Sequence, residues 1–190
     1  MPDDELAFAT IAYQSQLLRR GDLSPVELTQ LYLDRIDAYD EHLNAYLTVT
    51  AERAIASARA AEAAIQGGDW RGPLHGIPVA LKDLFDVVGL PTTAGSIILG
   101  EQIASRDATA ARRLFEAGAI LLGKTQMVEF AFGGAGINHH HGTPWNPWDL
   151  QEHRLPGGSS SGSGVAVSSG LTSAALGTDT GGSVRIPASF

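Results

Sequence analysis

The chain has 190 residues, of which 44% are hydrophobic, so it can bury a sizeable core and suits one domain or part of one. Its 13 Lys and Arg against 21 Asp and Glu give a net charge of −8, which argues against a nucleic-acid surface, and its lack of cysteine excludes disulfides, thiolate catalysis and cysteine-ligated zinc. The charge leads us to expect no nucleic-acid partner. Every apolar run is far shorter than the roughly 18 residues of a membrane span, so we expect no membrane partner. The N-terminus is acidic where a signal peptide is basic, so we expect a cytoplasmic protein.

Helical signals dominate the first third of the chain. Ser24 and Glu27 form a capping-box pattern with a proline at the first helical position, and apolar residues follow at helical spacing. Residues 44–50 alternate apolar and polar side chains and predict a short strand. The alanine-rich residues 51–66 predict a helix that ends at the two glycines after them. We therefore treat residues 1–70 as a helical lead-in.

From residue 71 onward, short apolar segments alternate with helical ones. Residues 77–81 and 119–122 predict strands, and residues 108–117 predict a helix between them. This alternation indicates an α/β fold with a mixed central sheet covered by helices. Residues 133–156 show no period and predict a long irregular loop, a type of segment that compact domains usually keep for function.

Glycine and serine crowd residues 157–183, where composition alone suits a flexible linker as well as a folded segment. Apolar residues at 165–167 and 174–176 favour the folded alternative, because true linkers lack such inserts. We expect a Gly/Ser loop, a short helix, a strand near residues 173–177 and a second glycine loop that ends at Ser183. Two serine-bearing loops of this kind bring hydroxyl groups and exposed backbone N–H groups together, as acyl transfer requires.

Two short motifs match known patterns but lack the surrounding structure that those patterns need. Residues 118–125 fit the P-loop pattern G-x-x-x-x-G-K-[ST], yet their central residues are the predicted strand, whereas a P-loop is itself a loop that follows a strand. We therefore do not expect nucleotide binding there. Residues 158–162 fit G-x-S-x-G, which would make Ser160 the nucleophile of an α/β-hydrolase. In these hydrolases the pattern forms a sharp turn, the nucleophile elbow, which needs a preceding strand and a later histidine. No histidine follows His153.

Three consecutive histidines, His139 to His141, suggest a metal site. Three neighbours cannot all point the same way, and no further ligand stands at the usual spacing, so we favour loop hydrogen bonds or the lining of a substrate pocket. Spacing alone leaves open a catalytic triad of His141, Asp149 or Asp179, and Ser183.

Four segments together resemble the amidase signature family. Residues 157–164 (GGSSSGSG) and 177–187 (GTDTGGSVRIP) match its glycine- and serine-rich signature, residues 72–83 (GPLHGIPVALKD) match its lysine motif, and residues 142–149 (GTPWNPWD) resemble the loop between them. The match runs from the lysine motif to the end of the chain. One departure is Ser161, where the family most often has glycine.

The resemblance implies a Ser–Ser–Lys triad, with Ser183 as nucleophile, Ser159 as bridging serine and Lys82 as base. A serine hydroxyl needs a proton acceptor to attack an amide, so we hypothesise that burial lowers the pKa of Lys82 and makes its neutral form accessible. The resemblance also implies a cis peptide bond between Gly158 and Ser159. It implies no metal and no organic cofactor.

Backbone N–H groups of the second glycine loop form the oxyanion hole that the resemblance implies. They belong to Ser183 and to the three residues before it, which are Thr180, Gly181 and Gly182. We expect Asp179 and Arg185 to form an ion pair that fixes this loop. We expect Ser160 to hydrogen-bond the region of the nucleophile without reacting itself.

The implied reaction is hydrolysis of a carboxamide C–N bond in a small molecule through an acyl-enzyme, by a free-standing amidase. Residues 83–93 and 145–148 favour that interpretation over an A-type subunit of an aminoacyl-tRNA amidotransferase. A third alternative is an inactive truncated fragment or a non-catalytic binding module.

Family members continue well past the nucleophile, so we expect residues 1–190 to be the N-terminal part of a single amidase domain. Residues 71–190 are then its catalytic-core portion, and the C-terminal half of the domain is missing. Assembly as a homodimer stays open.

Overall fold

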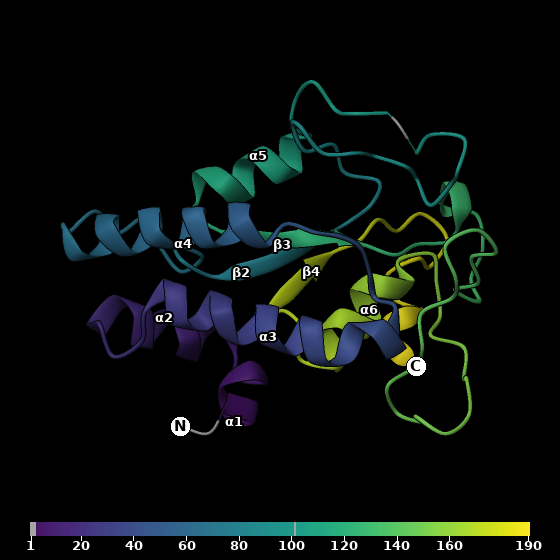
Figure 1. Cartoon of the computed structure of the whole chain (residues 1–190), viewed down its shortest axis with the longest axis horizontal. Coiled ribbons are helices and arrows are strands. Elements are labelled where there is room, and N and C mark those ends of the chain that lie inside the picture. Colours follow the sequence, from purple (N-terminus) through teal and green to yellow (C-terminus); the bar gives the residue numbers. More distant parts are fainter. Residues whose placement is uncertain (1–2, 101) are drawn as a thin grey trace.

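The computed structural model describes residues 3–100 and 102–190, and four strands form one mixed sheet at its centre (Figure 1). In sheet order the strands are β1 (Tyr46–Val49), β3 (Ile120–Thr125), β2 (Pro78–Lys82) and β4 (Ala174–Leu176). Strand β2 runs parallel to both β3 and β4, whereas β1 runs antiparallel to β3. This architecture confirms the predicted α/β fold with a mixed sheet.

Helices cover both faces of the sheet, and alternate side chains of β3 divide between two apolar clusters. Ile120 and Leu122 belong to the larger cluster with α3 (Pro25–Leu43), α4 (Ala51–Gln66) and α6 (Ser161–Ser168). Leu121 belongs to the smaller cluster with α5 (Thr109–Glu116). The other helical segments are α1 (Asp3–Ala7), α2 (Ile11–Arg20) and the 3-10 turns η1 (Glu129–Ala131) and η2 (Pro187–Ser189).

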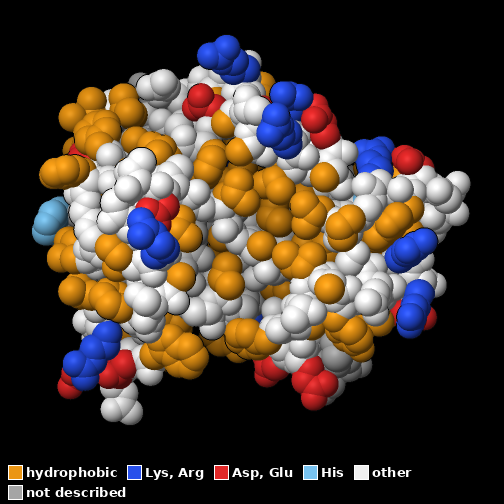
Figure 2. Space-filling model, turned by 180° about the vertical axis from the view of Figure 1, so that it is seen from behind, with side chains coloured by type: hydrophobic (Ala, Val, Ile, Leu, Met, Phe, Trp, Pro, Cys, Tyr) orange, Lys and Arg blue, Asp and Glu red, His pale blue; other side chains and the backbone are white. Residues whose placement is uncertain are grey.

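Apolar surface remains outside these clusters. Figure 2 shows hydrophobic side chains gathered across the middle of the face opposite to the view in Figure 1, with charged side chains around them. Strand β4 is only half-buried along its length, and large side chains such as Ile98 and Phe132 are exposed. A contiguous apolar patch marks a surface that another protein segment or a ligand can cover.

Local sequence explains where the long helices begin and end. The Ser24 hydroxyl accepts the N–H groups of Val26 and Glu27, and the Glu27 carboxylate accepts the Ser24 N–H, so the predicted capping box starts α3. The same helix ends at Asn44, which adopts the left-handed conformation with a φ of 52°. Helix α4 spans the predicted residues 51–66. No helix in the described part of the chain is long and apolar enough to cross a membrane.

The parallel strands place the candidate site. Lys82 of β2 pairs with Thr125 of β3, and Leu81 pairs with Leu176 of β4, so the carboxyl ends of the three strands meet at one edge of the sheet. In open α/β sheets, ligands bind in the crevice at that edge. The predicted irregular loop of residues 133–156, which contains no helix or strand, also follows β3.

Replacing Gly123 with alanine is expected to destabilise the protein by about 1–3 kcal/mol, the usual cost of overpacking. Gly123 lies on β3 opposite β1, and an added Cβ would collide with the carbonyl oxygen of Thr48. Gly100→Ala is the control, because its Cβ would meet only the Ile97 carbonyl oxygen at 3.4 Å. Urea unfolding measures both variants, and equal midpoints for the two would contradict the prediction.

Candidate active site

Lys82 and Ser159 meet at the carboxyl edge of the sheet. Lys82 is the last residue of β2, and its Nζ donates to Ser159 Oγ at 2.7 Å and to Thr178 Oγ1 at 2.9 Å. Lys82 and Ser159 are both fully buried. Because neither hydrogen-bond partner of Nζ is a carboxylate, an ammonium charge at this position is poorly compensated.

The surroundings of Lys82 favour its neutral form. Burial lowers the pKa of Lys82 from 10.5 to about 8, although the negative charge of Asp179 acts in the opposite direction. This direction agrees with the shift hypothesised from the sequence. With a pKa near 8, about one tenth of the lysine is neutral at pH 7.

Backbone hydrogen bonds on two sides hold the loop that carries Ser159. The peptide bond between Gly158 and Ser159 is cis, as the resemblance implied. Gly158 donates its N–H to the carbonyl oxygen of Gly134 at 2.8 Å, and the carbonyl oxygen of Ser159 accepts the Val128 N–H at 3.1 Å. The irregular segment after β3 therefore packs directly on the serine loop and fixes Ser159 against Lys82.

Ser183 joins the site through the neighbouring serine loop. The Ser160 N–H donates to the carbonyl oxygen of Ser183 at 3.0 Å. The Ser160 hydroxyl donates to the Thr178 carbonyl oxygen at 3.4 Å and accepts the Thr178 N–H at 3.3 Å. Ser160 thus ties the two glycine-rich loops together. Ser183 is half-buried, and its hydroxyl makes no hydrogen bond with a described residue.

Asp179 organises the loop around Ser183. Its carboxylate accepts backbone N–H groups from Gly182 (2.8 Å), Val184 (3.0 Å) and Arg185 (3.1 Å), and it pairs with the Arg185 guanidinium at 2.8 Å. The Arg185 side chain and these N–H groups hold the pKa of Asp179 well below its usual range. The expected ion pair is present, and the backbone bonds on both sides of Ser183 add to it.

The direction of one N–H group differs from the expectation for the oxyanion hole. The Gly182 N–H points at Asp179 Oδ1, so it is not directed at a substrate oxygen. The sequence predicts Asp179 only as a partner of Arg185, and its second role as an acceptor of loop N–H groups is visible only in the folded loop. The N–H groups of Thr180, Gly181 and Ser183 make no hydrogen bond with a described residue.

Comparison with known proteins identifies the family of this chain. The family model described as Amidase matches residues 27–190. The chain belongs to the amidase family. Among curated proteins it is 48% identical over 186 residues to the A-type subunit of the glutamyl-tRNA(Gln) amidotransferase of Moorella thermoacetica, and 49% identical over 185 residues to that of Geobacter metallireducens. These alignments cover 98% and 97% of this chain and 38% of each relative, so the chain spans well under half of the relatives' length.

Solved amidase structures share the fold of this chain. The native peptide amidase of Stenotrophomonas maltophilia is 38% identical, with a TM-score of 0.87 over 95% of this chain and 38% of that one. A second solved structure is 39% identical, with a TM-score of 0.91 over 95% of this chain and 39% of that one. It comes from a complex described as vestigial and connected with the evolutionary origins of an s-triazine catabolic enzyme. The amidase-type α/β fold is therefore established for this chain.

Sequence reasoning missed Thr178, the second hydrogen-bond partner of Lys82. Its hydroxyl reaches the amine because β4 lies next to β2, and Thr178 lies two residues after Leu176, the last residue of β4. A hydroxyl just beyond the carboxyl end of a third parallel strand was the available signal. Ser161 carries a further buried hydroxyl, which has no hydrogen-bond partner among the described residues.

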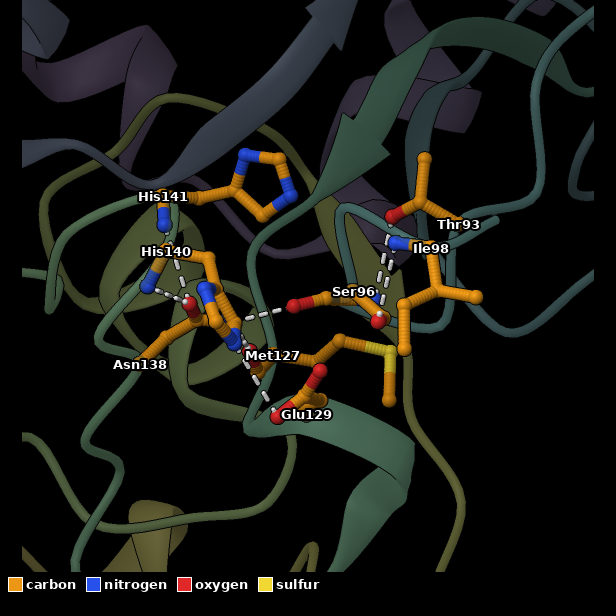
Figure 3. A network of polar contacts seen from close by, with 9 residues as sticks. Thr93, Ser96, Ile98, Met127, Glu129, Asn138, His140 and His141 are labelled. Atoms are coloured by element: carbon orange, nitrogen blue, oxygen red, sulfur yellow. Dashed lines mark hydrogen bonds and ion pairs between the residues drawn. The ribbon is translucent and has the colours of Figure 1, made fainter. Parts of the chain in front are cut away.

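A buried asparagine, also missed, holds the histidine-rich loop of this amidase chain (Figure 3). The Asn138 amide nitrogen donates to the carbonyl oxygens of Gly95 and Met127 at 2.8 Å each. Its oxygen accepts the N–H groups of His140 at 2.9 Å and His141 at 3.0 Å. All four bonding positions of the amide are used, so Asn138 joins three segments that are distant in sequence.

The histidines support the loop and do not gather into a metal site. His140 Nε2 lies 3.3 Å from a carboxylate oxygen of Glu129 (Figure 3), and the carbonyl oxygen of His141 accepts the Gln126 side chain at 2.9 Å. Across residues 3–100 and 102–190, no three His, Asp or Glu side chains are grouped to hold a metal ion. His140 and His141 make loop hydrogen bonds, which is one of the two roles expected of these histidines.

The alternative triad finds no support in the geometry. Asp149 pairs with Arg154 at 3.0 Å, and Asp179 pairs with Arg185. Within the described segments, no hydrogen bond links His141 to either carboxylate or to Ser183. His141 therefore has no orienting acid here, which a Ser-His-Asp mechanism requires.

The two rejected motifs have structural explanations. The P-loop match is strand β3, and its lysine, Lys124, is fully buried and donates to Asp83 at 2.7 Å. Ser160 precedes α6, but residues 151–158, all of which are described, contain no strand. Neither phosphate binding nor an α/β-hydrolase elbow fits these surroundings, as predicted.

Proposed function

We propose that this chain carries the catalytic centre of a serine amidase, with Lys82 as base, Ser159 as bridging serine and Ser183 as nucleophile. The observation that supports it best is the buried contact of 2.7 Å between Lys82 Nζ and Ser159 Oγ, beside the loop that carries Ser183. Membership of the amidase family supports cleavage of a carboxamide C–N bond.

The proposed chemistry moves one proton along the triad. Ser183 Oγ attacks the carbonyl carbon of the amide, its proton passes to Ser159, and the Ser159 proton passes to the neutral amine of Lys82. The tetrahedral intermediate collapses when Ser159 gives a proton to the leaving nitrogen and takes one back from Lys82. Water then hydrolyses the acyl ester on Ser183 by the same path.

Backbone N–H groups next to Ser183 stabilise the oxyanion in this proposal. Thr180, Gly181 and Ser183 itself are the donors that Asp179 leaves free. One such donor stabilises the transition state by roughly 3 kcal/mol. The substrate is a small amide, and the chemistry needs no metal or organic cofactor because lysine supplies the base.

A second candidate function is that of the A-type component of an amidotransferase. The observation in its favour is the identity of 46–50% to proteins of that name, at 88–98% coverage of this chain. Under this alternative the same triad would release ammonia from glutamine for a partner protein. Ammonia release from glutamine, compared with release from simple carboxamides, distinguishes the two functions.

Covalent labelling with a fluorophosphonate tests the shared chemistry. We expect one adduct per chain, mapped to Ser183 by peptide mass spectrometry, and no adduct in Ser183→Ala. Ser160→Ala is the control and should still be labelled. Labelling that survives Ser183→Ala but disappears in Ser160→Ala would transfer the nucleophile role to Ser160. A folded wild-type chain that takes no label would support the inert-fragment or binding-module alternative.

Replacing Asp179 with asparagine is expected to slow this labelling by roughly 10²-fold, the usual effect of misplacing a reacting group by about 1 Å. The variant keeps the shape of the side chain but weakens its contacts with Arg185 and the three loop amides. Arg185→Gln is the matched control, because it removes the ion pair and leaves the backbone bonds. Equal rates for the two variants would mean that the ion pair alone orders the loop.

A further inference from the structure

A polar cavity of about 260 Å³ lies at the end of β3 opposite to the catalytic edge, between α4 and α5. These two helices run side by side in Figure 1. Arg53 and Ser57 line it from α4, Phe115 from α5, and Arg71 and His75 from the loop before β2. None of the described residues that line it is Asp or Glu, although acidic residues outnumber basic ones 21 to 13 in the chain. Asp69 lies beside the cavity and pairs with Arg71 at 3.3 Å. The lining itself is therefore positively charged within an acidic protein.

His75 lines this cavity and offers it a hydrogen-bond donor. It is 1% exposed, and its Nδ1 accepts the Arg71 N–H at 3.2 Å, so the proton of the neutral ring is on Nε2. Burial, together with the Arg71 charge, lowers the pKa of His75 and keeps the ring neutral near pH 7. No described residue accepts a hydrogen bond from Nε2. Nε2 is not among the buried polar atoms that lack a partner, so this N–H can donate to solvent or to a ligand in the cavity.

The position of the His75 ring is fixed by its neighbours. Gly118, with a φ of +86°, lies so close that an added Cβ would collide with the ring. The Trp70 ring lies on another side, 5.7 Å away between centroids. The donor is therefore already held in place before any ligand arrives, which favours binding.

Arg53 is held in place without an acidic partner. Its guanidinium lies over the Phe115 ring, 5.7 Å from the centroid, and Nη1 donates to the Val88 carbonyl oxygen at 3.1 Å. No carboxylate in the described part of the chain pairs with Arg53, whereas Asp69 pairs with Arg71 at 3.3 Å. Arg53 therefore keeps its full charge and several free N–H donors at the cavity.

We propose that this cavity is a binding site for a small anion, in which the Arg53 guanidinium and the His75 Nε2–H donate to the oxygens of a phosphate or carboxylate group. Arg71, whose charge Asp69 partly balances, lies beside them, and Ser57 offers a hydroxyl. Charge-assisted hydrogen bonds from arginine are the strong ones in such sites. The volume of about 260 Å³ is below that of pockets for drug-sized ligands, so the ligand is the size of inorganic phosphate or a short carboxylic acid. The site does not depend on the amidase chemistry.

NMR titration of the whole chain with inorganic phosphate, and separately with propionate, tests the proposal at pH 7.5 and constant ionic strength. We expect a saturable shift of the His75 ring nitrogens, with Nε2 protonated from the start and a dissociation constant of about 1 mM. Saturation by phosphate alone identifies a phosphate site, and saturation by propionate alone identifies a carboxylate site. Saturation by both identifies a general site for small anions.

Arg53→Gln should weaken binding by about tenfold or more, because it removes a charged hydrogen bond. Arg59→Gln is the matched control, since Arg59 is exposed on the same helix, lies outside the cavity and changes the net charge equally. Arg71→Gln is the second variant if Arg53→Gln fails to give a folded spectrum, and it should weaken binding as well. No saturable shift with either anion, or equal weakening by Arg59→Gln, would overturn the proposal.

Discussion

Replacing Lys82 with methionine is expected to slow the reaction of Ser183 with a fluorophosphonate by roughly 10²–10⁴-fold, the usual contribution of a positioned general base. Methionine keeps the length and apolar stem of the side chain but cannot accept the proton of Ser159. Lys82 contacts only two hydroxyl groups through Nζ, so the change breaks no ion pair. Labelling rates measured by mass spectrometry check the size of the effect.

The same base sets the pH dependence expected of the wild type. Only neutral Lys82 accepts a proton, and its pKa is about 8, so the labelling rate should rise about tenfold per pH unit below that value and level off above it. The base is protonated at low pH, so activity falls as pH falls. A rise centred near pH 6.5 would point to histidine, and a flat profile would remove the base role from Lys82.

Circular dichroism provides the structural control for Lys82→Met. The spectrum should match that of the wild type, because the substituted side chain stays buried and apolar. Thr178→Val is the matched variant that removes only the second partner of Nζ, and it should slow labelling much less than Lys82→Met does. Equal losses in the two variants would show that packing around the lysine, and not its amine, limits the reaction.

Local chemistry made most of the fold predictable. The capping box of Ser24 and Glu27 fixed the start of α3, and the glycines after Gln66 fixed the end of α4, because both signals act within one turn of helix. The apolar residues 119–122 predicted a strand, which in the structure is Ile120–Thr125, and this strand also explains why the P-loop match failed. Strand order involves distant segments and did not follow from these patterns.

The candidate site was predictable only in part, because its contacts join distant segments. Lys82 and Ser159 are 77 positions apart, and from the residues alone a histidine triad stayed open. The resemblance to a family supplied that long-range pairing. Thr178 and the direction of the Gly182 N–H were missed because they depend on how two loops meet, which no spacing rule describes.

A buried ion pair next to Lys82 gives the second large expected effect. Lys124 is 0% exposed, and its Nζ donates to Asp83 at 2.7 Å and to the Pro91 carbonyl oxygen at 3.0 Å. The second oxygen of Asp83 accepts the N–H of Thr93 at 2.9 Å. Asp83 follows Lys82 directly, so this network also anchors the end of β2.

Lys124→Met is expected to destabilise the protein by about 3–5 kcal/mol, because it leaves the Asp83 carboxylate buried without its counter-charge. Urea unfolding measures this loss, provided that the slope of the transition stays constant. Adding Asp83→Asn to Lys124→Met removes the unpaired charge and keeps an oxygen that can accept the Thr93 N–H, so the double variant should be more stable than Lys124→Met alone. If instead the two losses simply add, the pair is not coupled, and the cost lies in packing around Lys124.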